Sequence, residues 1–117
     1  MQRRDKITIQ KVISEMNIGI ELLGDTSLNE FLENELLKRA SGMTAINVGE
    51  LIKVVTDETR QKYPQFPWKA VAGMRDITAH RYQTLRMEDV YITVHDEYPI
   101  LIESLQNILI EDEDIER

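Results

Sequence analysis

Helical periodicity is the feature of this sequence that most constrains its fold. Apolar residues recur at three- and four-residue steps through nearly the whole chain, and the alternation of apolar and polar residues typical of a half-buried strand is almost absent. From about Asp5 to Leu23 this spacing places six apolar residues in one stripe: Ile9, Val12, Ile13, Met16, Ile20 and Leu23. The pattern predicts an all-α fold.

Local signals predict where the first helix stops and a second block begins. Gly24 suits a helix C-cap, and Ser27 with Glu30 has the spacing of a capping box. A second helical block is therefore expected over 28–62. Because glycine weakens a helix interior, a kink or break is expected near Ser41 and Gly42.

Prolines divide the remainder into two further blocks. Pro64 and Pro67 cannot lie inside a helix, although Pro67 can begin one, so a third block is expected over 67–82. A fourth is expected over 87–110, with a kink at Pro99. Since short connections join these blocks, we expect an antiparallel up-and-down bundle of four to five helices.

Length and composition bound the class of protein. The 117 residues fit a single domain over 1–110, followed by an acidic tail, 111–117, that we expect to be solvated and frayed. The chain has no cysteine and no apolar run long enough to span a membrane, so we expect a cytoplasmic protein without a membrane partner. A net charge of −7 argues against a general nucleic-acid coat protein, although it leaves room for a small basic cleft.

The stretch MRDITAHRY carries the densest set of reactive side chains. On a helix, Asp76 lies one turn before His80 and can hydrogen-bond the imidazole, which fixes the tautomer and raises the basicity of the other nitrogen. Arg75 and Tyr82 share a second stripe. From spacing alone the same residues also fit an ordinary polar helix end, with surface and capping groups and no chemistry.

If the stretch is a reactive site, a phosphodiester is the substrate that suits it. Arg75 can grip a phosphate through bidentate contacts while His80 transfers protons. One histidine with scattered carboxylates lacks the ligands of a zinc or two-metal site, so no cofactor is expected. Cleavage without a metal needs a nucleophile within the substrate. RNA supplies one as its 2′-hydroxyl and DNA does not, so RNA is the favoured substrate. Two proton-transfer groups are then required, and a twofold homodimer would supply both.

The motif and its surroundings resemble a known family. Arg75 to Tyr82 match the R-x4-H-x-Y signature of HepT-like toxins, a branch of the HEPN domain superfamily. The segments SLNEFLENE, INVGELIKVV, YPQFPWKAVAG and EYPILIESLQNIL are also similar to the family in order and spacing, so that the resemblance covers about residues 5–110.

The resemblance implies a HEPN-like helical dimer with two motifs facing a shared cleft, and the metal-independent ribonuclease activity of a toxin in a type VII-like toxin-antitoxin system. It implies Arg75 and His80 as the active-site pair. Tyr82 matches a tyrosine that, in some members, a nucleotidyltransferase antitoxin modifies with AMP. The expected partners are RNA, with tRNA as one candidate, this antitoxin and a second copy of the chain, with a larger hetero-oligomer as a further option.

Several other residues have two interpretations. Arg81 either adds positive charge for RNA at the cleft mouth or is simply solvated, and Glu50 either supports the motif helix or makes a polar contact between helices. Trp68 is expected to anchor the core or an interface, and His95 to be a surface residue. The rival function is a non-catalytic helical module that binds a nucleotidyltransferase or a nucleotide, and the acidic net charge leaves this alternative open.

Overall fold

A computed structural model of the chain describes residues 1–73 and 86–116. These residues form helices only and no strand, which confirms the all-α prediction. Three helices are long: α1 (Arg3–Leu23), α3 (Glu35–Lys53) and α7 (Tyr98–Glu116). The shorter elements are α2 (Leu28–Leu32), α4 (Asp57–Lys62), α5 (Trp68–Ala72), α6 (Met87–Ile92) and a π-helical turn, η3 (Thr93–Glu97). The elements are therefore more numerous than the four to five helices expected.

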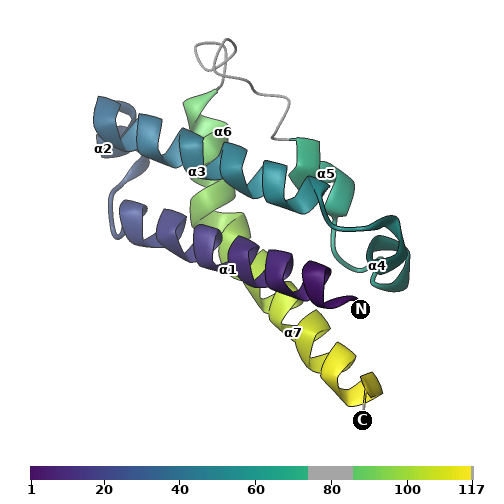
Figure 1. Cartoon of the computed structure of the whole chain (residues 1–117). Helices are drawn as coiled ribbons and strands as arrows, with labels where there is room; N and C mark the ends of the chain where they lie inside the picture. The colour runs from purple at the N-terminus through teal and green to yellow at the C-terminus, as the bar shows by residue number, and fades with distance from the viewer. Residues whose placement is uncertain (74–85, 117) are drawn as a thin grey trace.

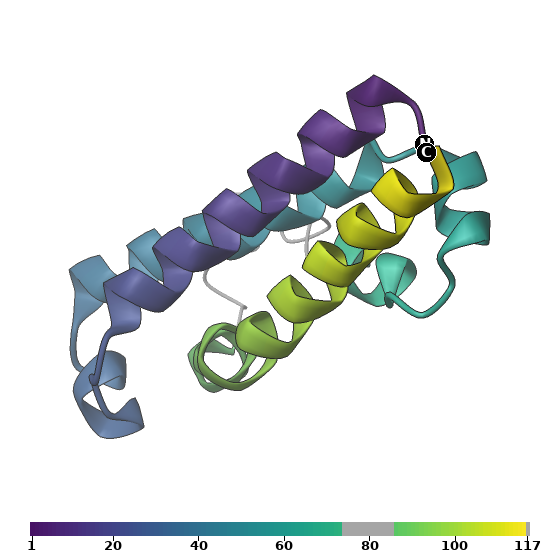
Figure 2. The same ribbon diagram turned by 90° about the horizontal axis from the view of Figure 1, so that it is seen from below.

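The long helices form the body of the bundle. α1 and α3 run side by side in opposite directions, and α7 packs against α1 (Figures 1 and 2), so that the Met1 amino group reaches Asp112 of α7. α5 packs against α3, and α6 with η3 passes behind α3 to reach α7 (Figure 1). The expected helical bundle is thus confirmed, and α5 and α6 lie on either side of the segment 74–85.

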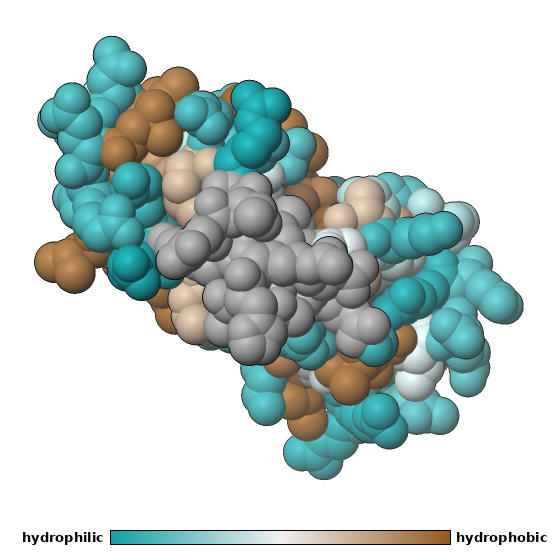
Figure 3. All heavy atoms as spheres, turned by 90° about the horizontal axis from the view of Figure 1, so that it is seen from above, coloured by the Kyte–Doolittle hydropathy of each residue, from teal (hydrophilic) through white to brown (hydrophobic). Residues whose placement is uncertain are grey.

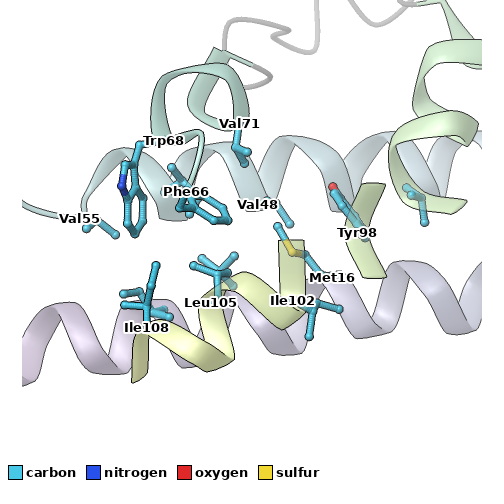
Figure 4. Packing of buried hydrophobic residues seen from close by; sticks show 14 of the residues in the cluster. Met16, Val48, Val55, Phe66, Trp68, Val71, Tyr98, Ile102, Leu105 and Ile108 are labelled. Atoms are coloured by element: carbon cyan, nitrogen blue, oxygen red, sulfur yellow. The ribbon is translucent and has the colours of Figure 1, made fainter. Parts of the chain in front are cut away.

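The core lies where α1, α3, α5 and α7 meet. Phe66, Trp68 and Val71 point from the α5 side toward Leu105 and Ile108 of α7 (Figure 4). The stripe predicted for α1 is buried at Ile9, Val12, Met16 and Leu23 and half-buried at Ile13 and Ile20. Each fully buried large apolar side chain contributes roughly 1.5–3 kcal/mol.

Gly19 allows α1 to approach its neighbours closely. A Cβ atom at this position would lie 3.2 Å from Thr44 Cγ2 and 3.3 Å from Val94 Cγ1. Both of those side chains are buried and β-branched, so they have little freedom to move away. The absence of a side chain here therefore sets the spacing between α1, α3 and η3.

The second predicted block is divided by two N-caps. Ser27 and Glu30 form the predicted capping box at α2, but Asn34 and Thr56 then cap α3 and α4. α3 runs unbroken through Ser41 and Gly42, so the break expected there is wrong. The interruptions fall instead where Asn34 and Thr56 accept hydrogen bonds from the first turn of the following helix.

The last helical block is irregular just before Pro99, where it contains the π-helical turn η3, and the kink itself stays a prediction. The N–H of Tyr98 donates to the carbonyl of Thr93, five residues earlier. Pro99 has no N–H for a bond to the preceding turn, and its ring crowds that turn, so the wider spacing relieves the conflict. Val94 and Tyr98 are both buried on either side of this widened turn.

The residues assigned to a frayed tail are helical instead. α7 continues to Glu116, and Asp112 is fully buried. Its Oδ1 accepts hydrogen bonds from the Tyr63 hydroxyl and the Met1 amino group, both at 3.0 Å. These partners hold this turn of α7 against the bundle, so the expectation of a solvated tail is wrong at Asp112. The division into a domain and a tail at residue 110 stays a prediction.

One face of the bundle shows mostly polar side chains among its described residues. Seen from above, hydrophilic side chains cover most of the described surface, and hydrophobic groups form separate areas between them (Figure 3). No helix within 1–73 or 86–116 is long and apolar enough to cross a membrane.

Candidate functional site

The predicted catalytic motif lies between α5 and α6. Arg75, Asp76, His80, Arg81 and Tyr82 fall within 74–85 and therefore lie outside the described residues. Their roles stay predictions. The structure does describe α5 and α6, the helices that precede and follow this segment in the chain. Their positions limit the distance that the segment can span.

The N-terminal end of the segment is anchored by Trp68. Its indole N–H donates to the carbonyl of Tyr63 at 2.9 Å, and its ring packs on Phe66 with the ring centroids 4.6 Å apart. Only 6% of Trp68 is exposed, which confirms the predicted core anchor. A five-residue helix is unstable by itself, so these contacts and the buried Val71 hold α5 in place.

The C-terminal end is anchored by α6. The Tyr91 hydroxyl donates to the carbonyl of Thr26 at 2.7 Å, and its ring lies 5.4 Å from that of Phe31. Val90 is fully buried in the core. These contacts fix α6 against the turn before α2 and against α2 itself.

Chain length links the predicted residues to these anchors. A residue of extended chain spans at most about 3.6 Å, so the two residues from Gly73 to Arg75 span about 7 Å and the four from Tyr82 to Arg86 about 14 Å. Arg75 is thus tied closely to the end of α5, and Tyr82 to the start of α6.

The charge of this part of the chain is opposite to that of the whole. Residues 69–86 contain Lys69, Arg75, Arg81 and Arg86 against the single carboxylate of Asp76, in a chain of net charge −7. Lys69 and Arg86 are exposed at the two ends, and Arg86 pairs weakly with Asp89 at 3.9 Å. A local excess of positive charge suits an anionic ligand such as a phosphodiester.

Glu50 is the one predicted site residue within the described part of the chain. It lies exposed on α3, the helix against which α5 packs, and it forms no hydrogen bond or ion pair with another described residue. Its neighbour Asn47 is half-buried. The supporting role of Glu50 toward the motif stays a prediction.

His95 is a surface residue, as predicted, but it has partners. Its side chain is 50% exposed, its Nδ1 lies 2.6 Å from Asp96 Oδ1, and its ring stacks on Tyr91 at 5.2 Å between centroids. The structure therefore places this imidazole beside the anchor of α6. Among the described residues, no group of three or more histidines and carboxylates could hold a metal ion.

Two buried carboxylates escaped the sequence reasoning. Asp5 is fully buried and accepts hydrogen bonds from the N–H of Thr56 at 3.2 Å and from the hydroxyls of Thr56 and Thr59. Burial would raise the pKa of Asp5, but these hydrogen bonds hold its pKa below the ordinary value. Burial opposes the ionised form of Asp112 as well, and the Met1 amino group and Tyr63 lower its pKa.

These carboxylates tie α4 to the rest of the bundle. Asp5 joins α1 to the N-terminus of α4. Asp112 joins α7 to Tyr63, the residue that caps the C-terminus of α4. Arg60 donates to the carbonyls of Ile52, Lys53 and Val55 at the end of α3. Because Trp68 bonds to the carbonyl of Tyr63, the α5 anchor depends on this network. In the sequence, Asp5 and Asp112 are each an acidic residue within a predicted helical pattern. Such residues are ordinarily exposed, so their burial was not predicted.

Comparison with known proteins identifies a family that covers most of the chain. The family model described as "Ribonuclease HepT-like" matches residues 10–108, which include the whole motif. The chain is 30% identical to "Putative RNase TTE0752" of Caldanaerobacter subterraneus subsp. tengcongensis, over 86% of this chain and 90% of that protein. It is 31% identical to "Putative RNase MJ0125" of Methanocaldococcus jannaschii, over 93% and 95% of the two chains.

A more distant relative carries the family name itself. The chain is 23% identical to "Probable ribonuclease HepT" of Thermococcus cleftensis, over 86% of this chain and 92% of that protein. No solved structure matches the chain. The family model spans most of the sequence, and the relatives are covered over nearly their full length. The chain belongs to the HepT-like ribonuclease family of the HEPN superfamily.

Proposed function

We propose that this ribonuclease is a metal-independent toxin that cleaves RNA in a cleft shared by two copies of the chain. The observation that carries the proposal is the family match over residues 10–108, within which Arg75 and His80 fit the R-x4-H-x-Y signature. The local excess of positive charge over 69–86 supports an RNA substrate, with tRNA as one candidate.

The proposed chemistry uses the RNA's own nucleophile. One His80 takes the proton of a 2′-hydroxyl, the 2′-oxygen attacks the phosphorus, and the bond from phosphorus to the 5′-oxygen breaks. The second His80 donates its proton to that leaving oxygen, so the products are a 2′,3′-cyclic phosphate and a 5′-hydroxyl. Arg75 holds the non-bridging oxygens and stabilises the charge that develops on them.

The neighbouring residues support this pair in distinct ways. Asp76 orients His80 and favours its protonated form, and Glu50 supports the motif from α3. Arg81 adds a positive charge for the RNA backbone. The two chain anchors at Trp68 and Tyr91 hold the segment that carries these residues.

Regulation is proposed to act through Tyr82. A nucleotidyltransferase antitoxin transfers AMP from ATP to its hydroxyl: the tyrosine oxygen loses its proton and bonds to the α-phosphorus, and pyrophosphate leaves. The product carries a phosphate and a nucleoside beside Arg75. The added negative charge repels RNA, and the added bulk blocks the cleft. The partner is then bound in a hetero-oligomer that contains at least the toxin dimer.

The test is RNA cleavage and toxicity of variants that still fold. We expect Arg75→Ala and His80→Ala each to abolish cleavage and toxicity, because the first removes the contact to the phosphate and the second removes the proton transfer. Ser14→Ala, on the exposed face of α1, should retain cleavage and toxicity. Intact RNA with the wild-type dimer, unchanged from His80→Ala, would instead favour a non-catalytic module that binds a nucleotidyltransferase. Peptide mass spectrometry after co-expression with the transferase should find AMP on Tyr82.

A further inference from the structure

The first nitrogen of the chain takes part in an ion pair at one end of the bundle. The Met1 amino group donates to Asp112 Oδ1 at 3.0 Å, across 111 residues of sequence. The two side chains are closed to solvent, with 0% of Met1 and 1% of Asp112 exposed. The ion pair therefore joins the residues before α1 to α7, and solvent and salt weaken it less than they weaken a surface pair.

Asp112 depends on this nitrogen for its charge balance. Within 1–73 and 86–116, Met1 provides its only ion pair, and Asp112 Oδ2 has no hydrogen-bond partner. Burial opposes the ionised form, but the Met1 amino group and the Tyr63 hydroxyl hold the pKa of Asp112 below its ordinary value, with a smaller contribution from the charge of Lys62. Without the ammonium charge, the buried carboxylate would have no cation within ion-pair distance in the described part of the chain.

An acyl group on this nitrogen would change the charge of the site more than its packing. Acylation converts an ammonium, with a positive charge and three N–H donors, into a neutral amide with a single N–H. Met1 also lines a hollow of about 390 Å³, together with Arg3, Lys6, Ile7 and Gln10, so a small group has room beside this residue. What remains is a buried carboxylate without its cation, and removing one partner of a buried ion pair strongly destabilises a fold.

We propose that the Nα atom of Met1 is a control site at which a small acyl group, formyl or acetyl, weakens the bundle by removing the charge that balances Asp112. Tyr63 carries the effect toward the candidate site, since its hydroxyl donates to Asp112 and its carbonyl accepts from the Trp68 indole. Acylation therefore weakens the contacts that hold α4 to α7 and, through them, the anchor of α5. The inference concerns folding and does not depend on the proposed ribonuclease function.

Two N-terminal groups of similar size separate charge from bulk. Chains with an acetyl group or two methyl groups on the Met1 nitrogen can be made by ligating a synthetic peptide, 1–39, to the remainder at Ala40. Each modified nitrogen keeps one N–H, but at about pH 6 only the dimethylated amine keeps the positive charge. We expect acetylation to raise the unfolding equilibrium constant, measured in urea titrations, by at least about 10-fold over the unmodified chain, and dimethylation to change it by less than about 3-fold.

Variants at Asp112 and at the next residue localise the effect. In Asp112→Asn, which removes the buried charge and keeps the side-chain volume, the acetylated and dimethylated chains should be equally stable. In Glu113→Gln, which removes an exposed carboxylate 3.8 Å from Lys6, the full difference between the two chains should persist. The fluorescence of Trp68 should report the same differences, because its indole bonds to the carbonyl of Tyr63. An acetylated chain that fails to fold while the dimethylated chain folds also supports the proposal.

Several results would overturn the proposal. Equal stability of the acetylated and dimethylated wild-type chains would show that the charge on Met1 contributes nothing to the fold. A difference of the same size in Asp112→Asn would assign the effect to another group. Peptide mass spectrometry of the natural, folded protein that finds an acyl group on Met1, or a residue before it, would remove this nitrogen as a control site. None of these outcomes bears on RNA cleavage, so they leave the proposed function standing or failing on its own test.

Discussion

Tyr63→Phe is the substitution that tests the contact between the end of α4 and α7. It keeps the buried ring and removes the hydroxyl that donates to Asp112 Oδ1 at 3.0 Å. Asp112 is fully buried, and its Oδ2 has no hydrogen-bond partner among residues 1–73 and 86–116. The variant therefore leaves the carboxylate with one fewer donor and no access to water.

The expected cost follows from that geometry. A hydrogen bond to a charged group contributes about 1.5–3 kcal/mol, so we expect the free energy of unfolding to fall by roughly 2 kcal/mol. Tyr91→Phe is the matched control, because it removes a hydroxyl that donates to the neutral carbonyl of Thr26. Its expected cost is smaller, on the order of 1 kcal/mol.

Urea unfolding provides the assay, with fluorescence and circular dichroism read on the same samples. Trp68 is the only tryptophan, and its indole bonds to the carbonyl of Tyr63, so its emission reports on the α5 anchor. We expect Tyr63→Phe to shift both signals to lower urea. A cost no greater than that of Tyr91→Phe, or full additivity of Tyr63→Phe with Asp112→Asn, would refute the reasoning.

Two further predictions concern α1. Gly19→Ala should lower the free energy of unfolding by roughly 1 kcal/mol in urea melts, because contacts of about 3.2 Å with Thr44 and 3.3 Å with Val94 outweigh the better helix propensity of alanine; Ser14→Ala, exposed on the same helix, should not destabilise. Asp5→Asn should destabilise most at neutral pH. The pKa of Asp5 is lower in the folded than in the unfolded protein, so the ionised carboxylate stabilises the fold above the unfolded pKa near 4, and this stabilisation is lost as the pH falls through the folded pKa. The urea midpoints of the wild-type protein and Asp5→Asn should therefore converge at low pH. A difference between the midpoints that does not change with pH would contradict this prediction.

Local signals were the part of the fold that the sequence could predict. The caps at Gly24 and at Ser27 with Glu30 depend on neighbouring residues, and the structure confirms them. The breaks at Asn34 and Thr56 were missed because apolar periodicity continues across them, although both residue types are strong N-caps.

Burial of charge could not be predicted because it depends on distant partners. Asp5 meets Thr59 across 54 residues, and Asp112 meets Tyr63 across 49. In each helix the carboxylate looked like a solvated residue, and only the packed bundle shows its donors. Pro99 predicted a kink in the last helix, but nothing in the sequence specified a π-helical turn, in which the N–H of Tyr98 bonds to the carbonyl of Thr93.

The candidate site divides in the same way. The candidate catalytic residues all lie within residues 74–82, so their types and spacing could be recognised in the sequence and Arg75, His80 and Tyr82 could be proposed from it. The anchors at Trp68 and Tyr91 became visible only with the bundle, because their hydrogen bonds join segments that lie apart in the chain or depend on the exact turn between them.

The nature of the RNA ends is the most direct test of the proposed mechanism. Mass spectrometry of RNA incubated with the wild-type protein in the presence of EDTA should find fragments ending in a 2′,3′-cyclic phosphate and a 5′-hydroxyl. His80→Ala should yield none, and 2′-O-methyl RNA should stay intact. Fragments that end in a 5′-phosphate, cleavage that stops with EDTA, or fragments that His80→Ala still produces would contradict the proposed mechanism.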